Sequence, residues 1–174
     1  INDNDRDIIG NSNPDFFGGL NNTFTYKGIE LNIFVQGNYG NEILNYGNFD
    51  LLNLTSGNNQ CARVLDRWTP ETPNAYFPRV KAYIAEDETE LGNPQTKYLQ
   101  DASYLRLKNI SLGYTFPANL VERIGLRKLR LFFSGDNLFT LTDYPGLDPE
   151  RGGNGVFVGY PQNKIYSFGL NVQF

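Results

Sequence analysis

The sequence predicts an all-β fold whose antiparallel strands form part of a transmembrane β-barrel. Three observations support this: several segments alternate between apolar and polar residues, no apolar run is long enough for a membrane helix, and short connections alternate with long ones. A membrane helix needs about 18 consecutive apolar residues, whereas a barrel strand needs only alternating ones. A membrane-spanning chain of this composition therefore has to cross as strands.

The clearest strand is the last, at about residues 163–174. Its apolar side chains share one parity and its small or polar ones share the other, which gives the strand one face of each kind. Either a protein core opposite water or lipid opposite an aqueous lumen produces this pattern. The strand ends on an aromatic residue rather than in a polar tail, which favours lipid. The apolar set is Tyr166, Phe168, Leu170, Val172 and Phe174.

Composition restricts the function. The 174 residues carry a net charge of -4, with one Cys, no His and no Met. An acidic balance without a basic block gives no support for nucleic-acid binding. The absence of His removes the usual general base and the commonest metal ligand. We therefore expect no enzyme, metal or cofactor, and we interpret the lone Cys61 as a packed or partly exposed thiol. Because the chain begins at Ile1 without a leader, we expect a mature product, a processed piece or an excerpt.

The first two strands form a hairpin. They are expected at about 17–26 and 29–37, joined by Lys27–Gly28, because a two-residue gap containing Gly between alternating runs is typical of a tight turn. In the second strand Glu30 and Asn32 lie opposite an apolar face. Because unpartnered polar groups are costly in a dry core, these two residues favour a wet lumen.

Two further strands follow, at about 103–116 and 127–135. Asn109 is expected on the polar face of the first, while Tyr104, Arg106 and Lys108 are expected on the face that becomes apolar. Residues 117–125 predict a short helical turn that begins near a Pro and ends at a Gly. The segments at about 38–102 and 136–162 are predicted as long loops, the second with a helical turn at 136–139.

Connection lengths give an orientation. Short turns and long loops alternate along the chain, and bacterial barrels place the short turns in the periplasm and the long loops outside the cell. The carboxyl terminus is then periplasmic. Five strands cannot close a barrel, and open edges are not tolerated in lipid. We therefore expect the chain to be the carboxy-terminal portion of a larger barrel.

Several blocks carry a resemblance to a known family. YLQDASYLRLKNISLGYTFP (98–117), RLFFSGDNLFTLTDYPGLDPE (130–150), a final strand ending in Phe and the segment 5–40 together resemble the end of SusC/RagA-type TonB-dependent outer-membrane transporters. The resemblance covers nearly the whole chain, least well 57–91. It implies the last five strands of a 22-stranded barrel, with a plug domain and TonB contact in a missing amino-terminal part. It also implies a SusD-type surface lipoprotein as partner, and Phe174 as the signal for the barrel-assembly machinery.

The candidate site residues fall into two groups. Trp68 and Tyr144 are expected in outer loops, where they either stack on substrate or anchor loop packing. The residues expected to face the lumen are Glu30, Asn32, Asn109, Asn171 and Gln173. The carboxylates of Asp143, Asp148 and Glu150 could bind Ca²⁺, but their spacing matches no defined Ca²⁺ loop. We therefore predict that they belong to a solvated acidic loop.

The predicted function is outer-membrane import of oligosaccharides or peptides in a Gram-negative bacterium, with this chain as barrel wall and extracellular loops. The sequence leaves open which of these two cargos is carried. The alternative is a soluble β-rich glycan-binding module of the lectin-like kind. Solubility separates the two, because a lectin-like module is monodisperse without detergent and a barrel segment aggregates.

Overall fold

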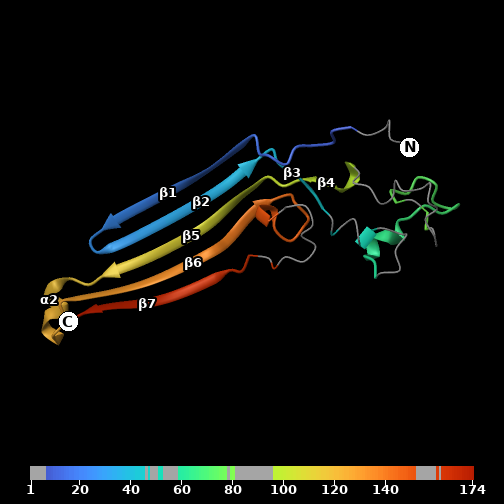
Figure 1. The fold of residues 1–174 in the computed structure, drawn as a ribbon. Helices are drawn as coiled ribbons and strands as arrows, with labels where there is room; N and C mark the ends of the chain where they lie inside the picture. Colours follow the sequence, from blue (N-terminus) through green and yellow to red (C-terminus); the bar gives the residue numbers. More distant parts are fainter. Residues whose placement is uncertain are drawn as a thin grey trace.

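The computed structural model describes residues 7–45, 47, 51–52, 59–77, 79–80, 96–151, 160 and 162–174. Its main element is a five-stranded antiparallel sheet in the order β1-β2-β5-β6-β7. Figure 1 shows the strands side by side, with the carboxyl terminus and α2 at one end and the long loops at the other. The strands are Phe16–Tyr26 (β1), Ile29–Tyr39 (β2), Tyr104–Thr115 (β5), Lys128–Thr142 (β6) and Ile165–Gln173 (β7).

The β1–β2 hairpin turns on two residues with left-handed backbone, as predicted. Lys27 has φ 46° and Gly28 has φ 88°. Positive φ at both central residues is the geometry whose twist matches paired antiparallel strands. Gly28 is also required sterically, because a Cβ at this position would come within 2.5 Å of the Thr115 carbonyl oxygen on β5.

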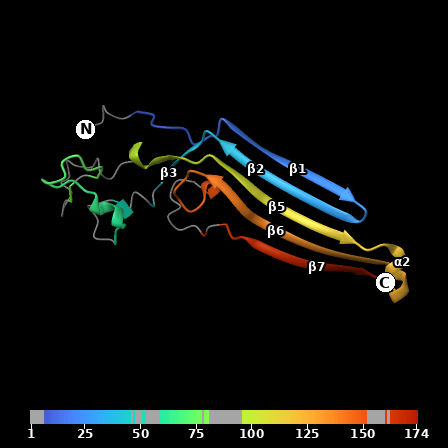
Figure 2. The same ribbon diagram turned by 180° about the vertical axis from the view of Figure 1, so that it is seen from behind.

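The β5–β6 connection contains the predicted helical turn. It consists of α2 (Ala118–Val121) and the 3-10 turn η5 (Glu122–Ile124), preceded by Pro117 and ended by Gly125 at φ 79°. Val121 is 2% exposed and fixes the turn against its surroundings. The short connections therefore lie at the same end of the sheet, which is also the end where β7 finishes (Figure 2).

The long β2–β5 connection contains a small substructure of its own. β3 (Glu42–Leu44) pairs with β4 (Leu99–Asp101), and the segment also holds the 3-10 turns η2 (Ala62–Leu65) and η4 (Thr96–Tyr98). Leu52, Phe77 and Tyr98 form a buried cluster here. This buried hydrophobic cluster thus lies in the connection and not on the sheet. Within the described residues, no helix has the length and apolar character to span a membrane.

One face of the sheet is apolar and exposed. The strand register places aromatic and aliphatic residues in rows across all five strands, with Asn22 as the one polar exception in the paired segments. One such row is Phe24, Leu31, Leu112, Phe133 and Phe168, whose outer members Phe24 and Phe168 are 59% and 73% exposed. No second sheet covers this face in the described part of the chain, so it lacks the core that a lectin-like sandwich needs.

The other face is mostly polar, and two of its three phenylalanines, Phe34 and Phe132, have a structural explanation; the third, Phe17, is exposed at the start of β1. Phe34 lies over Gly19 of β1, where a Cβ would come within 3.1 Å of the ring. Phe132 lies in the same way over Gly169 of β7, and a Cβ there would overlap the ring. Each ring therefore covers the bare backbone of a neighbouring strand, an arrangement known to stabilise glycine in sheets.

A bulge in β5 corrects one prediction. Leu107 pairs with Val35 but Asn109 pairs with Phe34, so Lys108 is an extra residue relative to β2. The bulge reverses which parity faces which side. Tyr104 and Arg106 consequently lie on the polar face, and the prediction that they continue the apolar face is wrong.

β6 is longer than predicted. The sequence placed its end at 135 and a loop with a helical turn beyond, but β6 continues to Thr142. Two residues of β6, Asn137 and Leu138, stand opposite the single residue Lys108 of β5, so β6 has a bulge of its own at this point. Asn137 has φ 53°, which breaks the alternation without ending the strand. The β6–β7 connection therefore begins at 143, and it contains the 3-10 turn η6 (Pro149–Arg151).

Candidate functional site on the polar face

A cluster of charged residues lies at the long-loop end of the polar face. Arg106 of β5 is 3% exposed and binds three partners. Its guanidinium donates to the Thr140 hydroxyl at 2.8 Å, to a Glu150 carboxylate oxygen at 2.6 Å and to an Asp148 carboxylate oxygen at 2.8 Å. A planar guanidinium with five N–H donors can hold two carboxylates at once, which an ammonium does less well.

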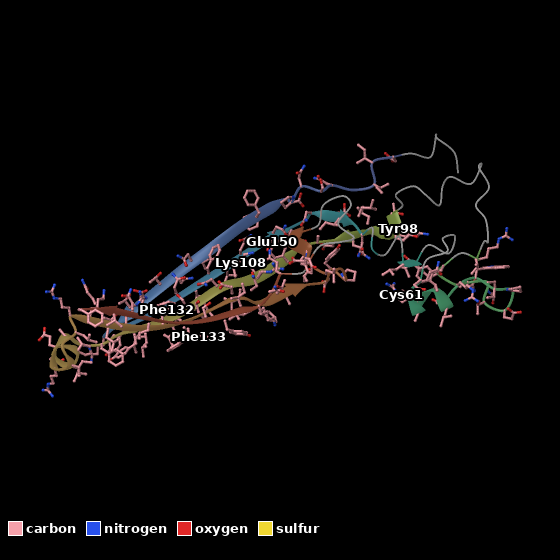
Figure 3. All side chains as sticks on the ribbon, turned by 60° about the horizontal axis from the view of Figure 1, so that its bottom comes forward. Cys61, Tyr98, Lys108, Phe132, Phe133 and Glu150 are labelled. Atoms are coloured by element: carbon pink, nitrogen blue, oxygen red, sulfur yellow. The ribbon has the colours of Figure 1, made fainter. Side chains whose placement is uncertain are left out.

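Lys108 completes the cluster. Its Nζ donates to both carboxylate oxygens of Glu150, at 3.0 and 2.8 Å, and Figure 3 shows the two side chains together near the long-loop end. The Gln36 amide on β2 also donates to Glu150, at 3.4 Å. We call Arg106, Lys108, Asp148 and Glu150 the Arg106 cluster. Two cations balance two carboxylates, so the cluster is neutral overall.

The cluster joins the β6–β7 connection to the wall of the sheet. The Arg106 and Asp148 side chains are 4% and 5% exposed. Burial raises the pKa of the Asp148 carboxyl, but hydrogen bonds from the Arg106 guanidinium and from the Glu150 and Gln162 backbone N–H groups lower it more. The net pKa of Asp148 therefore lies below its ordinary value. The prediction that Asp148 and Glu150 belong to a solvated acidic loop is wrong.

The residues predicted to face a lumen all lie on the polar face. Glu30 forms an ion pair with Arg130 at 2.6 Å, and the Asn32 amide donates to the Thr23 hydroxyl at 2.9 Å. Asn109 donates to an Asp136 carboxylate oxygen at 2.7 Å. Asn171 stands opposite Arg130 in the register, and Gln173 stands opposite Lys128. That this face lines a lumen stays a prediction.

Trp68 and Tyr144 lie in different connections. Trp68 is 39% exposed, and its backbone N–H donates to the Phe77 carbonyl at 2.8 Å. Tyr144 is half-buried, its ring covers Gly146, and burial raises the pKa of its phenol. The described contacts do not bring the two rings together. Tyr144 thus has the packing of a loop anchor, and the exposed ring of Trp68 is the one available for stacking.

Phe174 follows the last residue of β7 and is 82% exposed. It continues the parity of Phe168 and Leu170, and therefore the apolar face. Its role as an assembly signal is not tested by these contacts. Among the described residues, no group of three or more His, Cys, Asp or Glu side chains is arranged to hold a metal ion.

The arrangement provides a wall with fixed polar groups. The polar face combines amides, hydroxyls and paired charges, which hydrogen-bond water or a polar solute passing over them. Sequence reasoning missed the Arg106 cluster, because Arg106 and Asp148 are far apart in the chain. The bulge that places Arg106 on this face also has no local sequence signature beyond the break in alternation at Lys108.

No protein-family model matches the chain. TonB-dependent receptor P3 of Formosa agariphila is 41% identical over 183 residues, which cover 98% of this chain and 17% of that receptor. TonB-dependent receptor SusC of Bacteroides thetaiotaomicron is 32% identical over 104 residues, covering 58% of this chain and 10% of that receptor.

A solved structure shares the fold. The structure of the RagAB peptide importer in its closed-closed state aligns with a TM-score of 0.78 at 28% identity, over 96% of this chain and 18% of that chain. The open-open state of the same importer aligns with a TM-score of 0.74. The chain therefore spans less than a fifth of the length of each of these relatives.

Proposed function

We propose that this chain, which belongs to the TonB-dependent receptors of the SusC/RagA type, forms barrel wall and extracellular loops in an outer-membrane importer of oligosaccharides or peptides. The chain contributes wall and loops only. The plug domain and the contact with TonB then belong to the rest of the protein. A SusD-type lipoprotein at the barrel mouth is the partner we propose, and the barrel-assembly machinery inserts the whole.

The observation that carries this proposal is the difference between the two faces of the sheet. Large apolar side chains are exposed across the whole of one face, while the other face holds polar groups and the Arg106 cluster. Lipid outside and water inside stabilise both faces at once. The unpaired outer edges of β1 and β7 need neighbouring strands in a bilayer, which the rest of a barrel supplies.

Orientation follows from the connections. The short turns lie with the end of β7 and the long connections at the opposite end. Short turns are periplasmic in bacterial barrels, so we propose that the carboxyl terminus is periplasmic and the Arg106 cluster lies near the extracellular mouth.

The proposal is tested on the complete protein that contains this chain. Produced in a Gram-negative host, it should fractionate with the outer membrane and run as a heat-modifiable barrel. Labelled oligosaccharides and peptides should be taken up only while the proton gradient is intact, and a protonophore should abolish uptake. A protein that stays soluble, binds a glycan and transports nothing would instead support the lectin-like alternative.

A further inference from the structure

β6 and β7 separate at the long-loop end of the sheet. Their pairing ends at Asp136 and Ile165, whereas β6 continues to Thr142. A cavity of about 310 Å³ lies in the gap. Its polar lining comes from β6, from the residues just before β7 and from the Arg106 cluster, and includes Arg106, Asn137, Thr140, Asp148, Gln162 and Lys164.

Asn137 presents an unsatisfied acceptor in this lining. Its amide nitrogen donates to the Asn163 carbonyl at 3.2 Å, whereas its Oδ1 atom is buried and has no hydrogen-bond partner. Its backbone also has the left-handed φ of 53°. A buried acceptor without a donor is costly, and strained backbone of this kind is concentrated at binding sites. The two features together indicate a position that a ligand donor completes.

The cavity also carries an excess of positive charge. Asp148 is fully engaged, by Arg106 and by the backbone N–H groups of Glu150 and Gln162. Lys164 is exposed and forms no ion pair with any described carboxylate. Because the Arg106 cluster is neutral overall, Lys164 gives the cavity one excess positive charge. The positive excess favours an anionic group in the cavity.

We propose that this cavity binds an end group of the cargo in which a carboxylate stands next to a hydrogen-bond donor. Lys164 Nζ pairs with the carboxylate, and Asn137 Oδ1 accepts the donor. Two kinds of cargo carry this chemistry: a uronic acid residue, with its hydroxyls, and the carboxy-terminal residue of a peptide, with its amide N–H. A water molecule takes about 30 Å³ in the liquid, so the cavity has the volume of about ten water molecules. That volume accommodates one such residue. The inference rests on the proposed importer function.

Four small probes test the proposal on the complete transporter purified in detergent. D-glucuronate and N-acetylglycine carry the carboxylate, while D-glucose and N-acetylglycinamide are their neutral counterparts. Calorimetry or saturation-transfer NMR should detect binding of at least one carboxylate probe, about tenfold or more tighter than its neutral counterpart. Preference for glucuronate identifies glycan cargo, and preference for N-acetylglycine identifies peptide cargo.

Variants then locate the binding. Lys164→Gln should weaken the carboxylate probe about tenfold and leave the neutral one unchanged. Asn137→Gly removes the acceptor while tolerating the positive φ, and should also weaken binding. Lys128→Gln, at the opposite end of β6, is the matched control and should change nothing.

Two results overturn the inference: neither carboxylate probe binds better than its neutral counterpart, or Lys164→Gln binds the probes as Lys128→Gln does. Water then occupies the cavity. If the protein still takes up cargo in a proton-gradient-dependent way, only this inference has failed. If it is not an outer-membrane barrel at all, the proposed function has failed as well.

Discussion

Replacing Arg106 by Met should release the β6–β7 connection from the wall of the sheet. The substitution keeps an unbranched side chain but removes the donors to Thr140, Asp148 and Glu150. Asp148 would remain buried without its cation. Removing one partner of a buried ion pair costs about 3–5 kcal/mol. The equilibrium between anchored and released connection should therefore shift by on the order of a hundredfold to several thousandfold.

Hydrogen exchange of residues 143–151 in the complete, detergent-solubilised protein measures this shift through the Glu150 amide, which donates to the Asp148 carboxylate and exchanges when the connection opens. Arg130→Met is the matched control. It breaks the pair with Glu30, whose side chains are 35% and 47% exposed, and such pairs contribute about 0–1 kcal/mol. Exchange in 143–151 should be much faster in the Arg106 variant only.

A double variant, Arg106→Met with Asp148→Leu, sharpens the experiment. It removes the stranded charge together with its cation, so part of the protection should return, since an apolar pair can replace a buried ion pair at little cost. Equal exchange in the Arg106 and Arg130 single variants would refute the reasoning, because it would mean that the buried pair does not anchor the connection.

Four further predictions follow from named contacts. Because the folded pKa of Asp148 is depressed, its contribution to anchoring is present above the unfolded pKa of about 3.9 and is lost as pH falls through the folded value, which exchange of 143–151 measured down to pH 3 should show. Gly169→Val should destabilise the sheet in urea titrations, because the new side chain forces away the Phe132 ring that covers this glycine. Replacing Phe132 by a smaller residue in the same protein should restore part of the lost stability. Gly28→Ala should lower the unfolding midpoint more than Gly125→Ala, because both have positive φ but only the first meets backbone within 4 Å. Deleting Phe174 should reduce the fraction of heat-modifiable barrel recovered from the outer membrane.

The strands could be predicted from the sequence wherever a single parity held. β1, β2, β7 and residues 128–135 of β6 each keep one parity along their length, with few exceptions, and the hairpin and the Pro-to-Gly turn have local signatures. The prediction failed at Lys108 and Asn137, where an added residue interrupts the pattern. In a sequence, a bulge and the end of a strand interrupt the alternation in the same way. The prediction therefore ended β6 at 135, whereas the strand continues to Thr142.

The charged cluster could not be predicted for a different reason. Ion pairing between Arg106 and Asp148 depends on the face that Arg106 occupies and on the path of a connection after β6. Neither is encoded in nearby residues. The polar-face residues such as Asn32 and Asn171 needed only parity, and their common face followed from it.

Lys108, the extra residue in β5, determines which side chains of the strand lie on which face of the sheet. Deleting Lys108 would turn the segment from Tyr104 to Leu107 over, so that Arg106 would lie on the apolar face and its leucine neighbours on the polar face. A one-residue deletion would thus be far more harmful here than in the long connections. A sequence alignment of related strands that places the gap away from Lys108 therefore compares residues of the apolar face with residues of the polar face. An alignment that keeps the gap at Lys108 compares residues of the same face.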